Sequence, residues 1–78
     1  MHAIPLGIDE RKRKLGGKIK RLREAQGLSQ RRFALMVGVS PTYLWVVEAG
    51  RSNVGFSMLC RIADGLDISV SELLDFSD

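Results

Sequence analysis

The most constraining feature of this 78-residue chain is a pair of short apolar segments separated by only three residues. The segment QRRFALMV follows Ser29 and stops before Gly38, and the segment PTYLWVVEA follows Ser40 and stops before Gly50. Serine is favoured at the start of a helix and glycine at its end, and Pro41 suits the first helical position. Because the connection is too short for an antiparallel hairpin, we expect two helices that cross steeply.

That geometry is a helix-turn-helix, and the residue types fit it position by position. Ala34 is small where the second helix would cross close to the first, and Gly38 allows the positive φ angle that the turn favours. Five apolar residues would form the seam between the two helices and the core: Phe33, Val37, Val39, Leu44 and Val47. The alternative is a tight helical corner that has no role in DNA binding.

The rest of the chain shows helical periodicity without sustained alternation, which predicts an all-α, compact five-helix bundle. A first helix would begin between Asp9 and Leu15, where Gly16–Gly17 weakens its start, and would end before Gly27.

Two further helices are expected near the C-terminus. Ser57 would open a fourth helix with one apolar stripe, and Ser69 or Ser71 would cap a short fifth helix. The stripe consists of Leu59, Ile62, Ala63 and Leu66. We divide the chain into residues 1–14, a basic arm or an extension of the first helix, and residues 15–76, the folded domain.

Charge is distributed unevenly along the sequence. The net charge is +5 in residues 1–24, +2 in residues 25–52 and −4 in residues 53–78, which sums to +3. A basic face suggests a polyanion partner such as nucleic acid, and a solvated surface without a partner is the alternative.

Several classes of protein are disfavoured. Cys60 is the only cysteine, so the chain cannot form an internal disulfide, which fits a reducing cytoplasm. Because Cys60 lies on the apolar side of its helix, we expect a core thiol rather than a reactive one. No apolar run approaches a membrane span, and the N-terminus does not resemble a signal peptide. His2 is the only histidine, and neither a metal-ligand spacing nor a phosphate-binding loop is present. We expect no enzyme, no cofactor, no metal site and no small-molecule ligand.

The string LGGKIKRLREAQGLSQRRFALMVGVSPTYLWVVEAG resembles the helix-turn-helix of the lambda and 434 repressor-like (XRE-type) DNA-binding domains, and GRSNVGFSMLCRIADGLDISVSELL resembles their fourth and fifth helices. The resemblance covers about residues 15 to 74. In layout the chain is similar to stand-alone members such as restriction-modification controller proteins, small phage repressors and single-domain antitoxins. The resemblance implies a sequence-specific transcriptional regulator that binds double-stranded DNA as a homodimer, with the recognition helix Ser40–Ala49 in the major groove.

The resemblance also implies roles for particular residues. Base contacts are expected from Gln30, Thr42, Tyr43, Trp45 and Val46. Phosphate contacts are expected from Ser29, Arg31, Ser40, Arg51, Ser52 and Asn53, with Arg32 adding charge, although the serines could serve only as helix caps. Arg23 and Glu48 match a structural pair that bridges the first and third helices, and Val70 and Phe76 are expected at the dimer interface.

The recognition helix departs from the family pattern at Trp45 and Val46, where family members usually carry small polar or basic residues. Apolar side chains can pack on thymine methyl groups, but hydrogen bonds discriminate between bases more strongly. A rival hypothesis is therefore a protein-interaction module, similar to an antitoxin, in which an exposed patch of Tyr43, Trp45 and Val46 binds a protein partner.

Overall fold

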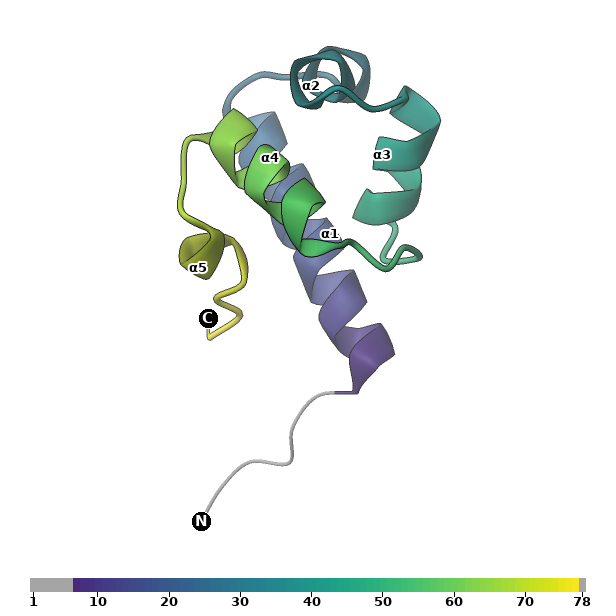
Figure 1. Ribbon diagram of the computed structural model, residues 1–78, viewed down its shortest axis with the longest axis vertical. Helices are drawn as coiled ribbons and strands as arrows, with labels where there is room; N and C mark the ends of the chain where they lie inside the picture. Colours follow the sequence, from purple (N-terminus) through teal and green to yellow (C-terminus); the bar gives the residue numbers. More distant parts are fainter. Residues whose placement is uncertain (1–6, 78) are drawn as a thin grey trace.

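The computed structural model describes residues 7–77, which form five α-helices and no strand (Figure 1). The helices are α1 (Ile8–Ala25), α2 (Gln30–Val37), α3 (Pro41–Glu48), α4 (Phe56–Leu66) and α5 (Val70–Leu73). Figure 1 shows α4 beside α1 at the centre, with α2 above them, α3 on the right and α5 on the left. The all-α, five-helix fold expected from the sequence is confirmed.

One hydrophobic core joins α1 to the four shorter helices. Its buried apolar residues are Ile19, Phe33, Ala34, Val37, Leu44, Val47, Ile62, Ala63, Leu66 and Leu73. Four of the five residues expected in the helix-turn-helix seam are among them, and the fifth, Val39, is half-buried against the same core. Each buried Leu, Ile or Phe side chain contributes about 1.5–3 kcal/mol, so the inner faces of α2 and α3 are firmly anchored.

The ends of α2 and α3 follow the local sequence closely. The hydroxyls of Ser29 and Ser40 accept hydrogen bonds of 3.0 Å from the backbone N–H groups of Arg32 and Tyr43. Gly38 ends α2 with φ of 85°, a conformation that a residue with a Cβ rarely adopts. The recognition helix therefore lies where it was expected, with Ser40 and Ala49 as its two cap residues.

Other helix boundaries differ from those expected. Ser57 does not open α4, because α4 begins at Phe56 and its first hydrogen bond runs from Leu59 N–H to the Gly55 carbonyl. Serine is only one of several residues that occupy this position, and here a glycine in extended conformation does so. α1 begins at Ile8, just before the expected range, and Ser69 rather than Ser71 caps α5, in a capping box with Glu72.

Gly16, which we expected to weaken α1, allows a close helix–helix contact. A Cβ at Gly16 would lie 2.4 Å from the carbonyl oxygen of Val47 and 2.5 Å from that of Glu48. Only a glycine lets the backbone of α1 approach the C-terminal end of α3 this closely. Gly17 differs, since a Cβ there would meet nothing within 4 Å.

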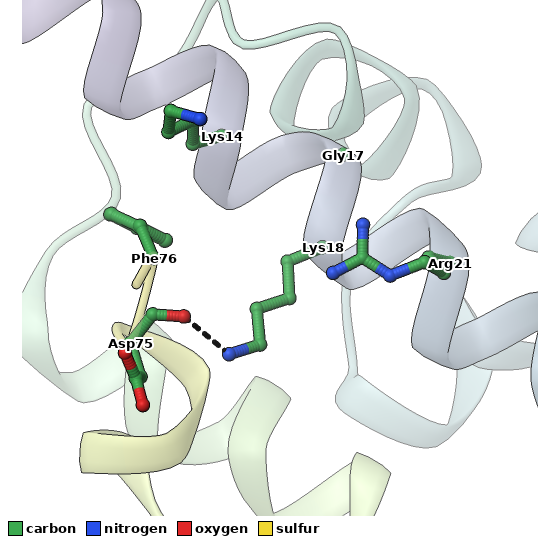
Figure 2. A pocket seen from close by; sticks show the side chains of 6 residues that line it. All are labelled: Lys14, Gly17, Lys18, Arg21, Asp75 and Phe76. Carbon is green, nitrogen blue, oxygen red and sulfur yellow. Dashed lines mark hydrogen bonds between the residues drawn. The ribbon is translucent and has the colours of Figure 1, made fainter. Parts of the chain in front are cut away.

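Lys18 attaches α5 to α1. Its ammonium group donates hydrogen bonds to the carbonyl oxygens of Glu72 and, at 2.6 Å, Asp75, near the C-terminal end of α5 (Figure 2). In Figure 2 the Lys18 side chain extends from α1 towards Asp75, with Arg21 next to it on α1.

The remaining expectations from the sequence concern the single cysteine, the single histidine, membrane spans and metal sites. Cys60 is half-buried and lies outside the core cluster, so the expectation of a core thiol was wrong. His2 lies outside the described residues. Across residues 7–77, no helix is long and apolar enough to cross a membrane, and no three His, Cys, Asp or Glu side chains gather as metal ligands would.

Candidate nucleic-acid interface

The outer face of α3 is open to a partner. Thr42 and Trp45 are exposed, and Trp45 keeps 52% of its surface accessible. Tyr43 and Val46 are half-buried, and Tyr43 packs against the edge of the core. Because Leu44 and Val47 hold the opposite face in the core, these outward side chains can contact a partner without disturbing the fold.

The N-terminal ends of α2 and α3 both open towards solvent, since Ser29 and Ser40 are exposed. Each hydroxyl is already an acceptor for a backbone N–H, but it can still donate its own proton to a phosphate oxygen. The first turns of helices also carry a partial positive charge that favours anions. Arg31 and Arg32 are exposed in the first turn of α2 and add two full charges to this end.

A buried ion pair connects α1 with the end of α3, as the resemblance implied. Arg23 donates from Nε to Glu48 Oε2 at 2.7 Å and from Nη2 to Oε1 at 3.0 Å. The two side chains are only 6% and 3% exposed. The hydrogen bond to Glu48 raises the pKa of Arg23 above its ordinary value, so the guanidinium stays charged. This two-bond geometry is the strong form of an arginine–carboxylate contact.

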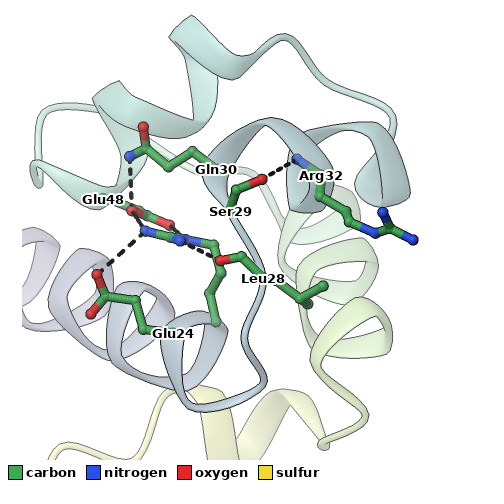
Figure 3. Close-up of polar contacts among 7 residues, drawn as sticks. Glu24, Leu28, Ser29, Gln30, Arg32 and Glu48 are labelled. Carbon is green, nitrogen blue, oxygen red and sulfur yellow. Dashed lines mark hydrogen bonds and ion pairs between the residues drawn. The ribbon is translucent and has the colours of Figure 1, made fainter.

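The ion pair extends into a network that reaches the start of α2 (Figure 3). Arg23 Nη1 donates to the Leu28 carbonyl oxygen at 2.6 Å, and Gln30 Nε2 donates to Glu48 Oε1 at 3.0 Å. In Figure 3 the Gln30 amide points down at the Glu48 carboxylate. The network therefore fixes α2 and α3 relative to α1, and it holds the Gln30 side chain beside α3. The family resemblance implied the Arg23–Glu48 pair, but nothing in the sequence indicated its hydrogen bonds to Leu28 and Gln30.

The loop after α3 carries the remaining residues for which phosphate contacts were expected. Arg51 and Asn53 are exposed and Ser52 is half-buried. Gly50 turns the chain with φ of 75°, and the Arg51 N–H then donates to the Val46 carbonyl at 3.0 Å. The guanidinium carbon of Arg51 lies 6.0 Å from the centroid of the Trp45 ring, a contact that no local sequence signal indicated.

The two residues expected at a dimer interface have different surroundings. Val70 packs half-buried against the core of its own chain, and Phe76 is half-buried at the edge of an apolar groove. The groove measures about 360 Å³, and besides Phe76 its apolar lining residues are Ile8, Leu15, Val54 and Leu74. Ile8 is 62% exposed and Leu74 is 41% exposed. The sequence did not single out Ile8 or Val54 for this surface, because they lie in segments far from the C-terminal end of the chain.

Comparison with known proteins agrees with this geometry. The helix-turn-helix family HTH_3 matches residues 19–73. The control protein C.MunI of a Mycoplasma species is 40% identical over 72 residues, which cover 91% of this chain and 95% of the relative. The restriction-modification controller protein C.AhdI from Aeromonas hydrophila superposes with a TM-score of 0.79 at 36% identity, over 82% of this chain and 97% of that chain. The master regulator for biofilm formation SinR, solved in complex with DNA, superposes with a TM-score of 0.74 at 34% identity, over 78% and 98% of the two chains.

Proposed function

The chain belongs to the helix-turn-helix family HTH_3, the XRE-type family that its sequence resembles, and on this premise we propose that it is a sequence-specific DNA-binding transcriptional regulator. The observation that carries this function is the open outer face of α3, flanked by the exposed first turns of α2 and α3. The named relatives support it, since SinR was solved with DNA and C.AhdI controls a restriction-modification system.

In the proposed complex, α3 lies in the major groove and its outer residues face the base edges. Thr42 and Tyr43 supply hydroxyl groups, and Trp45 and Val46 supply apolar surface. Gln30 reaches the DNA from the start of α2, where Glu48 holds its amide nitrogen and leaves its carbonyl oxygen to accept. The phosphate contacts are those expected above: Ser29, Arg31, Ser40, Arg51, Ser52 and Asn53.

A protein-interaction module that uses Tyr43, Trp45 and Val46 is less well supported. Two of these three side chains are half-buried against their own chain, so Trp45 alone offers a large exposed apolar surface on this face. Interfaces between proteins normally need a contiguous patch of several hundred Å².

The regulator would act as a homodimer whose two α3 helices enter the groove one DNA turn apart. The apolar groove beside Phe76 is the surface best suited to pair with a second copy, because Ile8, Val54 and Leu74 gather there while Val70 faces its own core. We therefore propose Phe76, rather than Val70, as the residue at the centre of the interface. Light scattering at micromolar concentration checks this, and a monomer mass both free and with DNA bound would contradict it.

The proposed function is tested by a mobility-shift assay with genomic fragments, repeated at increasing salt. A DNA-binding dimer that neutralises several phosphates should shift selected fragments at low salt. The logarithm of its affinity should then fall with the logarithm of the salt concentration, with a slope of about −0.9 for each phosphate neutralised. Replacing Thr42 with Ala should weaken binding to the selected fragments more than binding to random fragments. Phe56→Ala is the matched control, because Phe56 is exposed at the start of α4 and is not among the residues assigned to DNA contacts. The absence of a shifted band at low salt, together with a co-purifying protein, would favour the interaction module instead.

A further inference from the structure

The exposed indole of Trp45 and the guanidinium of Arg51 form one surface feature, which we call the Trp45–Arg51 pair. Their separation of 6.0 Å, from the guanidinium carbon to the ring centroid, is at the outer limit of a cation–π contact. Both side chains are exposed. Since α3 ends at Glu48, the pair lies at the C-terminal end of the recognition helix.

The backbone of Arg51 is fixed for this contact. The N–H groups of Gly50 and Arg51 donate to the carbonyl oxygens of Val47 and Val46, both at 3.0 Å, which closes the end of α3 and turns the chain back over its last turn. Gly50 also packs on α1, because a Cβ at Gly50 would lie 2.8 Å from the Cα atom of Arg13. Hydrogen bonds and packing therefore fix the position of the Arg51 backbone.

The side chain of Arg51 has fewer restraints than its backbone. The ion pairs and hydrogen bonds found within residues 7–77 do not include the Arg51 guanidinium, which leaves the Trp45 ring as its recorded contact. By contrast, Arg13, Arg23 and Arg61 all hydrogen-bond to protein oxygen atoms. Arg51 thus keeps its full hydrogen-bonding capacity for an external anion.

The indole itself is poorly equipped to read bases. It offers one N–H donor and no acceptor, whereas discrimination in the major groove relies on paired donors and acceptors. Trp45 also lines a hollow of about 170 Å³ together with the polar residues Lys20 and Gln30, so the surroundings of the ring are polar on this side too. An indole in this position is better suited to holding a guanidinium than to choosing a base pair.

We propose that Trp45 is a positioning residue that holds Arg51 against α3 in the orientation that binds a DNA backbone phosphate. Arg51 makes the charged contact, and the ring reduces the side-chain freedom that Arg51 loses on binding. This inference rests on the proposed function, and it replaces a direct base contact by Trp45 with an indirect role.

The test is a double-substitution cycle measured by fluorescence anisotropy, with W45L, R51Q and W45L/R51Q on a DNA site selected by the wild-type protein. W45L should weaken binding roughly three- to tenfold, and R51Q at least as much. In the R51Q background, W45L should have almost no further effect. If W45L costs the same factor in both backgrounds, Trp45 acts independently of Arg51 and the proposal is wrong.

Salt dependence separates positioning from a merely structural role. R51Q should lower the salt slope of log affinity by about 0.9 per subunit, because it removes one phosphate contact. W45L should lower the slope by part of that amount, because an Arg51 that the ring no longer holds occupies the phosphate contact less of the time. W45F keeps a ring and should lose less affinity than W45L. F56A, which removes another exposed apolar side chain outside the residues assigned to DNA contacts, serves as the unaffected control. A wild-type protein that binds no DNA would overturn the proposed function itself. Wild-type binding with a W45L slope unchanged would overturn only the role of Trp45.

Discussion

Removing the charge of Glu48 is predicted to destabilise the fold severely, because it isolates a buried guanidinium. In E48Q, Arg23 loses its buried counter-ion and at least one of two hydrogen bonds, while its side chain stays 6% exposed. Leaving a buried charge without its partner costs about 3–5 kcal/mol. A domain of this size has a total stability of roughly 4–12 kcal/mol, so E48Q should lose a large fraction of it.

The chain offers a matched control at the same arginine. Glu24 is 57% exposed and lies 4.0 Å from Arg23 Nη2, so its pairing is an exposed one, worth about 0–1 kcal/mol. Urea unfolding followed by circular dichroism should therefore show a far larger loss for E48Q than for E24Q. The double variant R23M/E48L removes both charges and should recover much of the lost stability. Equal losses for E48Q and E24Q, or a double variant no more stable than E48Q, would refute the reasoning.

Two further predictions concern α1 and α5. G16A should destabilise the protein by about 1–3 kcal/mol, because the new Cβ would overlap the Val47 and Glu48 carbonyls, whereas G17A should stabilise it by up to about 1 kcal/mol through helix propensity alone. Thermal unfolding measures both effects. Equal melting temperatures for G16A and G17A would show that α1 and α3 do not approach closely. S69A should cost about 0.5–2 kcal/mol by removing the capping box of α5, measurable by urea unfolding, and a loss below this range would mean that α5 does not depend on its cap.

Much of the motif could be predicted from local sequence. The bounds of α2 and α3 follow from Ser29, Gly38 and Ser40, because capping and positive φ angles are properties of single residues. The start of α4 could not be predicted in the same way. A serine at position 57 is a plausible cap, but the helix begins two residues earlier, with Gly55 as its cap and Phe56 as its first residue.

What the sequence could not indicate depends on contacts between distant segments. From the sequence alone Gly16 is only a poor helix former, and its role appears once the C-terminal end of α3 is found to pack against it. Trp45 and Arg51 are six positions apart, which is not a helical neighbour spacing, and only the turn at Gly50 brings them together. The apolar groove likewise combines α1, the α3–α4 loop and the C-terminal end. The family resemblance supplied the Arg23–Glu48 pair but not the hydrogen bond that links it to Gln30.

Selection of bound DNA from a random pool, followed by sequencing, tests the central claim most directly. A homodimeric helix-turn-helix regulator should enrich sites made of two half-sites related by two-fold symmetry, with centres about 10 base pairs or a multiple of one turn apart. An unenriched pool, or a bound sequence without any two-fold symmetry, would contradict it.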